Sequence, residues 1–230
     1  RGLSLVNWAP LFTSRMTEYA LIAATAFGLE GIVKRELREL GYEPTSVENG
    51  RVRFRGDALA IARCNLWLRC AERVLIEVGE FEARDFGALF DRTEALAWDR
   101  WLSADAAFPV KGRSVKSQLH SVPDCQRIVK KAIVERLKRT HGLEWFPESG
   151  PSYPVEIHLL SDWATLTIDT TGGGLHKRGY RTFVGPAPLR ETLAAALVLL
   201  SYWNESRPLA DPCCGTGTIP IEAALIARNR

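Results

Sequence analysis

The stretch Asp211-Pro212-Cys213-Cys214-Gly215-Thr216-Gly217-Thr218 has the features of a turn between a strand and a helix. A short apolar segment, 208–210, precedes it, and the helical pattern of 219–226 follows, with Thr218 expected to cap that helix. Two glycines one residue apart permit positive φ and let a ligand approach the backbone closely. The free N–H groups of such a turn and the positive end of the helix dipole favour an anion, either a phosphate or a carboxylate.

The turn lacks the lysine of a P-loop, which disfavours a nucleoside triphosphate. A Gly-x-Gly pair alone fits an ordinary tight turn equally well. The fuller string over residues 211–224 is more restrictive, and it resembles the first cofactor motif of class I methyltransferases that modify nitrogens of bases. The resemblance implies that S-adenosyl-L-methionine binds at the turn. The cofactor-binding residues that it implies are Pro188, Asp211, Cys213, Gly215 and Gly217.

The composition is that of a folded protein. The 230 residues are 46% hydrophobic and 25% charged, enough for one large core or two to three small ones. The longest apolar run, 193–200, is too short to span a bilayer, and the N-terminus lacks a signal-peptide pattern, so we expect a cytoplasmic protein without a membrane partner. Five cysteines without a C-x-x-C pair and four scattered histidines predict neither a disulfide framework nor a metal site.

Residues 17–81 predict a ferredoxin-like domain, because strands and helices follow in the order β-α-β-β-α-β. The expected elements are strand 19–24, helix 29–40, an Asn-Gly hairpin over 47–54, a helix capped by Asp57 that runs to about 69, and strand 74–78. Met16 is the only methionine, so residues 1–16 are treated as an extension that precedes the fold and is not part of it.

The next segment combines helix and strand patterns with a lopsided charge. We expect helix 86–98, strand 108–111, an amphipathic helix that opens at Pro123-Asp124, and strands 155–160 and 164–169 around a Ser161-Asp162 turn. Between 109 and 141 there are nine Lys or Arg against two acids, whereas the whole chain carries a net charge of +3. Such an excess indicates either a phosphate-backbone partner or a solvated helix face.

The neighbouring sequence favours the phosphate-backbone partner. Residues 108–119 with 124–133 resemble the core of a THUMP domain, an RNA-binding module of tRNA and rRNA modification enzymes. Residues 175–181 resemble the end of that module in THUMP-containing guanine-N2 methyltransferases, and 187–197 resemble the helix before their cofactor turn. The resemblance implies an α+β architecture with four parts after the extension: a ferredoxin-like domain at 17–81, a THUMP domain at 82–172, a linker at 173–188 and the start of a doubly wound α/β methyltransferase domain at 189–230.

The resemblance also implies an RNA-binding surface on which the cations converge, with Tyr180 and Phe183 as stacking side chains. The residues assigned to that surface are Lys111, Arg113, Lys116, Arg127, Lys130, Lys131, Lys177, Arg178 and Arg181.

The function implied is the RNA-binding front half of an RlmL-like enzyme that methylates guanine N2, with 23S rRNA as the first choice of substrate. The Asn/Asp-Pro-Pro-aromatic loop that the family uses for catalysis does not occur in these 230 residues, so we assign no catalytic residue and expect no activity from this chain alone. A strand at Leu209-Ala210 would lack neighbours, and Leu193, Leu197, Leu200, Trp203, Ile221 and Leu225 would face water. The alternatives are tRNA guanine methylation, tRNA thiolation, an inactive RNA-binding fragment and, more remotely, adenine-N6 methylation of DNA.

Overall fold

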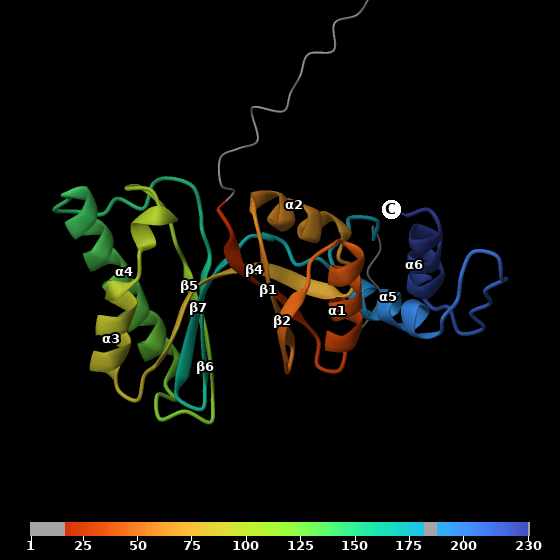
Figure 1. The fold of residues 1–230 in the computed structure, drawn as a ribbon, viewed down its shortest axis with the longest axis horizontal. Helices are drawn as coiled ribbons and strands as arrows, with labels where there is room; N and C mark the ends of the chain where they lie inside the picture. Colours follow the sequence, from red (N-terminus) through yellow and green to blue (C-terminus); the bar gives the residue numbers. More distant parts are fainter. Residues whose placement is uncertain (1–16, 182–187, 230) are drawn as a thin grey trace, which may run out of the picture.

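The computed structural model of the chain describes residues 17–181 and 188–229. Their centre is one seven-stranded sheet with the strand order β2-β3-β1-β4-β7-β6-β5. The antiparallel pairing of β4 with β7 joins two units into this sheet. Figure 1 shows α3 and α4 beside β5–β7 at one end, α1 and α2 beside the other strands, and α5 and α6 beyond them.

The first unit has the predicted ferredoxin-like order. Its elements are β1 (Tyr19–Thr25), α1 (Glu30–Glu39), β2 (Pro44–Glu48), β3 (Arg51–Gly56), α2 (Ala58–Trp67) and β4 (Ala71–Glu82). The predicted cap is confirmed, because the Asp57 carboxylate accepts a 2.8 Å hydrogen bond from the Ala60 N–H. Gly50 adopts the left-handed φ of 75° that the hairpin turn between β2 and β3 requires.

The second unit pairs two helices with three strands. Its elements are α3 (Phe86–Ala95), the 3₁₀ helix η2 (Trp98–Arg100), β5 (Val110–Val115), α4 (Val122–His141), β6 (Val155–Leu160) and β7 (Trp163–Asp169). The helix predicted over 86–98 therefore ends at Ala95. Beyond that end the buried Trp98 indole donates to the Thr93 carbonyl at 2.8 Å, which holds the chain in a separate turn. Ser161 and Asp162 both have positive φ, 49° and 67°, and form the predicted turn between β6 and β7.

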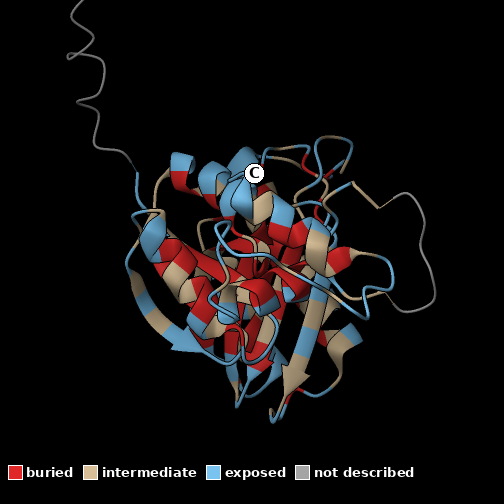
Figure 2. Cartoon of the chain, turned by 90° about the vertical axis from the view of Figure 1, so that its right-hand side faces the viewer, coloured by how far each residue is buried: buried red, intermediate tan, exposed pale blue. Residues whose placement is uncertain are grey.

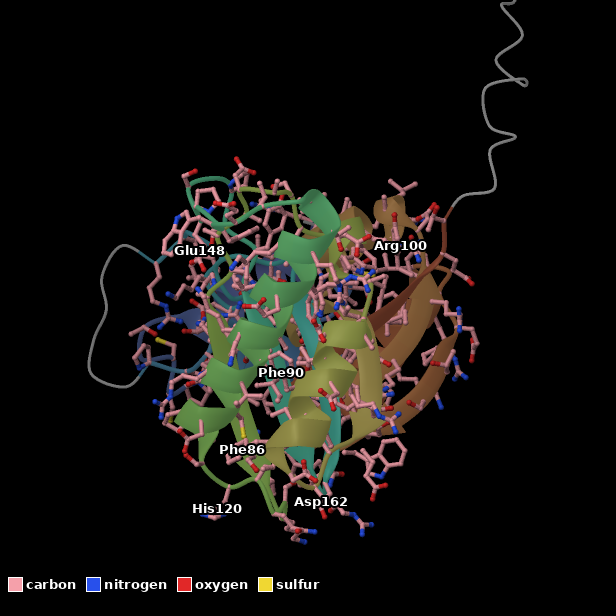
Figure 3. All side chains as sticks on the ribbon, turned by 90° about the vertical axis from the view of Figure 1, so that its left-hand side faces the viewer. Phe86, Phe90, Arg100, His120, Glu148 and Asp162 are labelled. Carbon is pink, nitrogen blue, oxygen red and sulfur yellow. The ribbon has the colours of Figure 1, made fainter. Side chains whose placement is uncertain are left out.

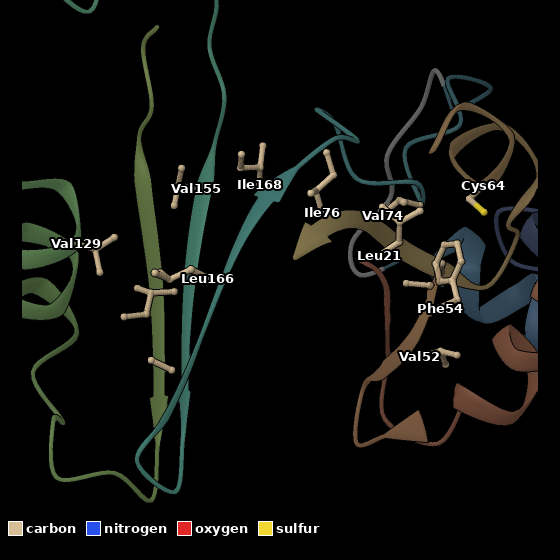
Figure 4. Packing of buried hydrophobic residues seen from close by; sticks show 14 of the residues in the cluster. Leu21, Val52, Phe54, Cys64, Val74, Ile76, Val129, Val155, Leu166 and Ile168 are labelled. Atoms are coloured by element: carbon tan, nitrogen blue, oxygen red, sulfur yellow. The ribbon is translucent and has the colours of Figure 1, made fainter. Parts of the chain in front are cut away.

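Helices cover one face of the sheet in both units, and the core lies beneath them. Leu21 and Phe54 are buried beside α1 and α2, whereas Val155 and Leu166 are buried beside α4 (Figure 4). Gly112 of β5 faces α4 so closely that a Cβ there would lie 3.1 Å from the Val122 side chain. Figure 2, which looks onto the α5–α6 end, shows the buried residues at the centre of the molecule. Since side chains alternate along a strand, the neighbours of the core residues point to the opposite face.

The C-terminal segment contains α5 (Glu191–Leu200) and α6 (Thr218–Ala227), which pack on each other. The strand predicted at Leu209-Ala210 does not form, because a strand needs a hydrogen-bonded neighbour and none of the seven strands reaches this segment. The predicted cap at Thr218 is also wrong. The residue before α6 is Gly217, and Thr218 is the first helical residue, with no side-chain capping bond.

The exposure expected at this end is found for four apolar side chains and not for two. Leu193, Leu197, Leu200 and Ile221 are exposed, whereas Trp203 and Leu225 are half-buried. An apolar hollow of about 450 Å³ lies between the end of α5 and the segment that leads to Asp211.

Candidate functional site

The turn before α6 has the backbone conformation expected of a turn that a ligand can approach closely. Gly215 and Gly217 have left-handed φ values of 52° and 74°. A Cβ on either glycine would meet no atom closer than 3.8 Å, so the backbone conformation, and not lack of space, calls for glycine. The Gly217 N–H donates to the Cys214 carbonyl at 2.7 Å, and Asp211 accepts from the Cys213 N–H at 3.1 Å. Residues 212–216 are exposed, so the N-terminus of α6 is open to an anion.

Pro188 lies apart from the rest of the predicted cofactor set. It lines a hollow of about 380 Å³ with Arg181 and Glu191, whereas Asp211 lines the apolar hollow below α5. Arg181 links the two places, because it lines the Pro188 hollow and its guanidinium lies 3.2 Å from the Thr218 hydroxyl at the start of α6.

A buried ion pair attaches α6 to the ferredoxin-like unit. The Glu222 side chain has no exposed surface and forms an ion pair with Arg178, which also donates to the backbone carbonyl of Arg69. The Tyr180 hydroxyl donates to the same carboxylate at 2.8 Å. Burial raises the pKa of Glu222, although Arg178 and Tyr180 act in the opposite direction. Burial, followed by the Glu222 contact, also raises the pKa of Tyr180.

A second polar group holds α5. Glu72 of β4 accepts from the Thr192 hydroxyl at 2.8 Å and lies 3.0 Å from the His176 ring. The Arg181 guanidinium pairs with Glu191 at 3.0 Å. The glycine turn is therefore carried on helices whose position relative to the sheet is set by buried polar contacts. Phe183, predicted as a stacking side chain, lies outside the described residues.

The expectation that the predicted cations converge on one face is wrong. Strand alternation turns Lys111 and Arg113 to the face of β5 opposite Gly112, and hence opposite α4. The other cations of this unit belong to α4, and Figure 3 looks onto the α3–α4 side. On that side Arg127 pairs with Asp124, Lys130 pairs with Glu148, and Lys131 lies over the Phe90 ring. In the segment 177–181, Arg178 and Arg181 serve the ion pairs described above, while Lys177 lines the Pro188 hollow. Lys116 has a left-handed φ of 51° at the end of β5.

The open face of the sheet holds a cleft that the sequence analysis missed. A hollow of about 290 Å³ lies between residues 49–51 of the first unit and residues 111–113 and 156–158 of the second. A hollow of about 480 Å³ continues it toward Leu160 and Trp163. Asn49, Arg51 and His158 line both hollows, so they form one cleft, named here the sheet cleft. The alternation Arg51-Val52-Arg53-Phe54-Arg55 was the signal that could have located one wall of it.

The sheet cleft is positive at its inner end. The cations Arg51, Lys111 and Arg113 line the smaller hollow, against the single carboxylate of Glu156, whose pKa burial raises. Burial, with the charges of Arg51 and Arg113, lowers the pKa of His158 from 6.5 to about 4, so this histidine is neutral at pH 7. In the larger hollow, Arg53 neutralises the lining carboxylates through ion pairs to Glu80 at 2.6 Å and Glu48 at 3.4 Å.

Within 17–181 and 188–229, no helix has the length and apolarity needed to cross a membrane. The same ranges contain no cluster of three His, Cys, Asp or Glu side chains that could bind a metal ion.

The fold and the turn together define a protein that joins a THUMP module to the beginning of a methyltransferase domain. Family models match in the same order: the RlmL ferredoxin-like domain over 20–75, the THUMP domain over 83–169, and the RMKL-like methyltransferase domain over 178–230. The chain belongs to the RlmL-like family of THUMP-containing RNA methyltransferases. The domain bounds 17–81, 82–172 and 189–230 remain predictions.

Two curated relatives are similar over most of the chain. The chain is 56% identical to "Putative RNA methyltransferase YpsC" of Bacillus subtilis, with 93% of this chain and 56% of that protein aligned. It is 39% identical to ribosomal RNA large subunit methyltransferase K/L of Aliivibrio fischeri, with 90% of this chain and 29% of that protein aligned. The chain thus spans about half the length of the first relative and less of the second.

Solved structures show the same fold. A predicted N6-adenine-specific DNA methylase from Listeria monocytogenes is 56% identical with a TM-score of 0.89, covering 93% of this chain and 56% of that one. SMU.472, a putative methyltransferase crystallised with SAH, is 49% identical with a TM-score of 0.88, covering 92% and 56%.

Proposed function

We propose that this chain supplies the RNA-binding part and the cofactor turn of an enzyme that transfers a methyl group from S-adenosyl-L-methionine to guanine N2 of RNA, with 23S rRNA as the preferred substrate. The observation that carries the proposal is the open glycine turn at the N-terminus of α6, held by Arg178 and Glu222 against a sheet that bears a positive cleft. Two relatives support it: SMU.472 was crystallised with SAH, and the Aliivibrio protein is named for ribosomal RNA.

The geometry of the turn fits the cofactor's charged methionine part. Exposed N–H groups and the positive end of α6 can bind a carboxylate, and the glycines at 215 and 217 leave the backbone accessible. The turn would hold the cofactor by its carboxylate, and the bound cofactor would supply an electrophilic methyl on a sulfonium for transfer to a guanine amine. A target base inside a helix has to be extruded to react. This chain contributes binding and orientation.

The test is a chimera in which this chain replaces the matching part of the Bacillus subtilis relative. Purified chimera with labelled S-adenosyl-L-methionine should label ribosomal RNA, and nucleoside analysis should find the label on guanine N2. The Gly217→Val variant should lose labelling. The control Gly28→Val changes a glycine of similar φ, 91°, outside the turn, and should keep it.

A second candidate, adenine-N6 methylation of DNA, has one observation in its favour, which is the name of the Listeria protein. A DNA arm in the same assay separates the candidates. Label on adenine in DNA, with none in RNA, would replace the proposal.

A further inference from the structure

The sheet cleft contains cations that the fold itself does not use. Among the described residues, Arg51, Lys111 and Arg113 form no ion pair and no side-chain hydrogen bond. Four of the six Lys and Arg side chains of α4 are paired instead: Arg136 pairs with Asp99 at 2.8 Å and Arg139 with Glu94 at 3.1 Å, as Arg127 and Lys130 pair with other acids. Three cations without a structural partner in one hollow are therefore free to bind a ligand anion.

An aromatic platform lies at the other end of the cleft. Trp163 is 52% exposed and Leu160 is 44% exposed, although both belong to paired strands. The Trp163 ring packs on no other aromatic ring or cation among the described residues. Asn49, whose amide both donates and accepts hydrogen bonds, lines the cleft between this platform and the cations.

The two ends are spaced for a nucleic-acid strand. In the strand register, Arg113 of β5 lies opposite His158 of β6, and His158 lies opposite Thr165 of β7. Trp163 lies two residues from Thr165 on β7. The Trp163 backbone is therefore two strands across the sheet and two residues along it from the Arg113 backbone, a distance of about 12 Å. A nucleotide carries its base and its charge on different groups, so one or two nucleotides can contact both ends.

We infer that the sheet cleft binds an unpaired segment of RNA, with a base stacked on Trp163 and the backbone phosphates beside Arg51, Lys111 and Arg113. This inference rests on the proposed function, in which RNA is the substrate, and adds which form of RNA the chain recognises and where. A paired A-form helix keeps its bases stacked inside, so its bases cannot reach Trp163, whereas loops, bulges and ends can splay theirs.

The experiment uses this chain and two labelled RNA probes: a single-stranded oligonucleotide, and the same strand annealed to its complement. Affinities are measured by fluorescence anisotropy over a series of salt concentrations. The unchanged chain should bind the single strand more tightly than the duplex. Trp163→Ala should weaken single-strand binding about 5- to 150-fold, the range of one lost base stack, and Trp163→Phe should restore most of it.

Charge variants and matched controls complete the design. Lys111→Ala and Arg113→Ala should each lower the slope of log affinity against log salt by about 0.7, the value for one phosphate contact with a single strand. Lys131→Ala removes a cation of the competing α4 surface and serves as a third arm. The controls are Trp145→Ala, which removes a tryptophan that is 79% exposed and lines neither hollow, and Lys34→Ala, which removes an α1 cation that lines neither hollow. Both controls should bind like the unchanged chain, and thermal melting confirms that each variant is folded.

The possible outcomes separate the two proposals. Binding that is lost in Lys131→Ala but unchanged in Trp163→Ala and Arg113→Ala would overturn the inference and leave RNA binding intact, on α4. Equal affinity for duplex and single strand would also overturn it. If the unchanged chain bound neither RNA at any salt concentration, the RNA-binding role in the proposed function would fail as well.

Discussion

Replacing Arg178 by methionine should loosen α6 at neutral pH and do little in mild acid. The change removes the partner of Glu222, whose side chain has no exposed surface, while Arg178 itself is 15% exposed. Breaking a buried pair from one side costs about 3–5 kcal/mol because a charge stays buried without compensation. Glu222 can escape this cost by taking up a proton, and this limits the effect.

The limit follows from the pKa. A carboxyl with the ordinary pKa of 4.5 takes up a proton at pH 7 at a cost of about 3 kcal/mol, because pH and pKa differ by 2.5 units. Burial has already raised the pKa of Glu222 above 4.5. The destabilisation in Arg178→Met should therefore be about 3 kcal/mol at most at pH 7. At pH 5 the same calculation leaves less than about 1 kcal/mol. Because the pKa of Glu222 is raised in the folded state, its stabilising contribution to the free energy of unfolding is present at low pH and lost as the pH rises.

Hydrogen exchange followed by mass spectrometry measures this locally. Protection of the α6 amides in Arg178→Met, relative to the unchanged chain, should fall by up to about 100-fold at pH 7 and recover at pH 5. The double variant Arg178→Met/Glu222→Leu should be protected at both pH values, since no charge remains buried. The same loss of protection at both pH values, or equal loss in the double variant, would refute the reasoning.

Three further predictions concern other parts of the molecule. His158→Asn should flatten the stability loss between pH 6.5 and about 4, because the buried neutral imidazole, which faces Arg51 and Arg113, resists protonation in the folded state; acid titration by circular dichroism measures it, and identical curves would contradict it. Gly217→Val should abolish binding of S-adenosyl-L-methionine in the chimera, by calorimetry, while RNA affinity stays unchanged; normal cofactor affinity would argue against the turn. The chain should self-associate through its exposed α5 face, and Leu197→Glu should reduce the mass seen by light scattering, whereas a monomeric unchanged chain would contradict this.

Local patterns were sufficient to predict most elements of the fold. The Asn49-Gly50 turn and the Asp57 cap depend on residues adjacent in the chain, and both were predicted in place. The motif at Asp211 to Thr218 was equally local, because positive φ at Gly215 and Gly217 is a property of the turn itself. Short-range interactions thus determined the elements and the glycine turn before α6.

Long-range contacts decided what the sequence could not. The joining of β4 to β7, between strands far apart in the chain, brings Arg51 and His158 to one cleft. The charge excess near α4 was visible in the sequence, but alternation and helix cover turned Lys111 and Arg113 to the opposite face. The strand expected at Leu209-Ala210 had the right composition and no neighbour to pair with. Sequence alone determined which residues carry charge and where the chain turns. Tertiary packing decided which cations form ion pairs, as Arg178 does with Glu222, and which remain available to a ligand, because pairing depends on distance in space.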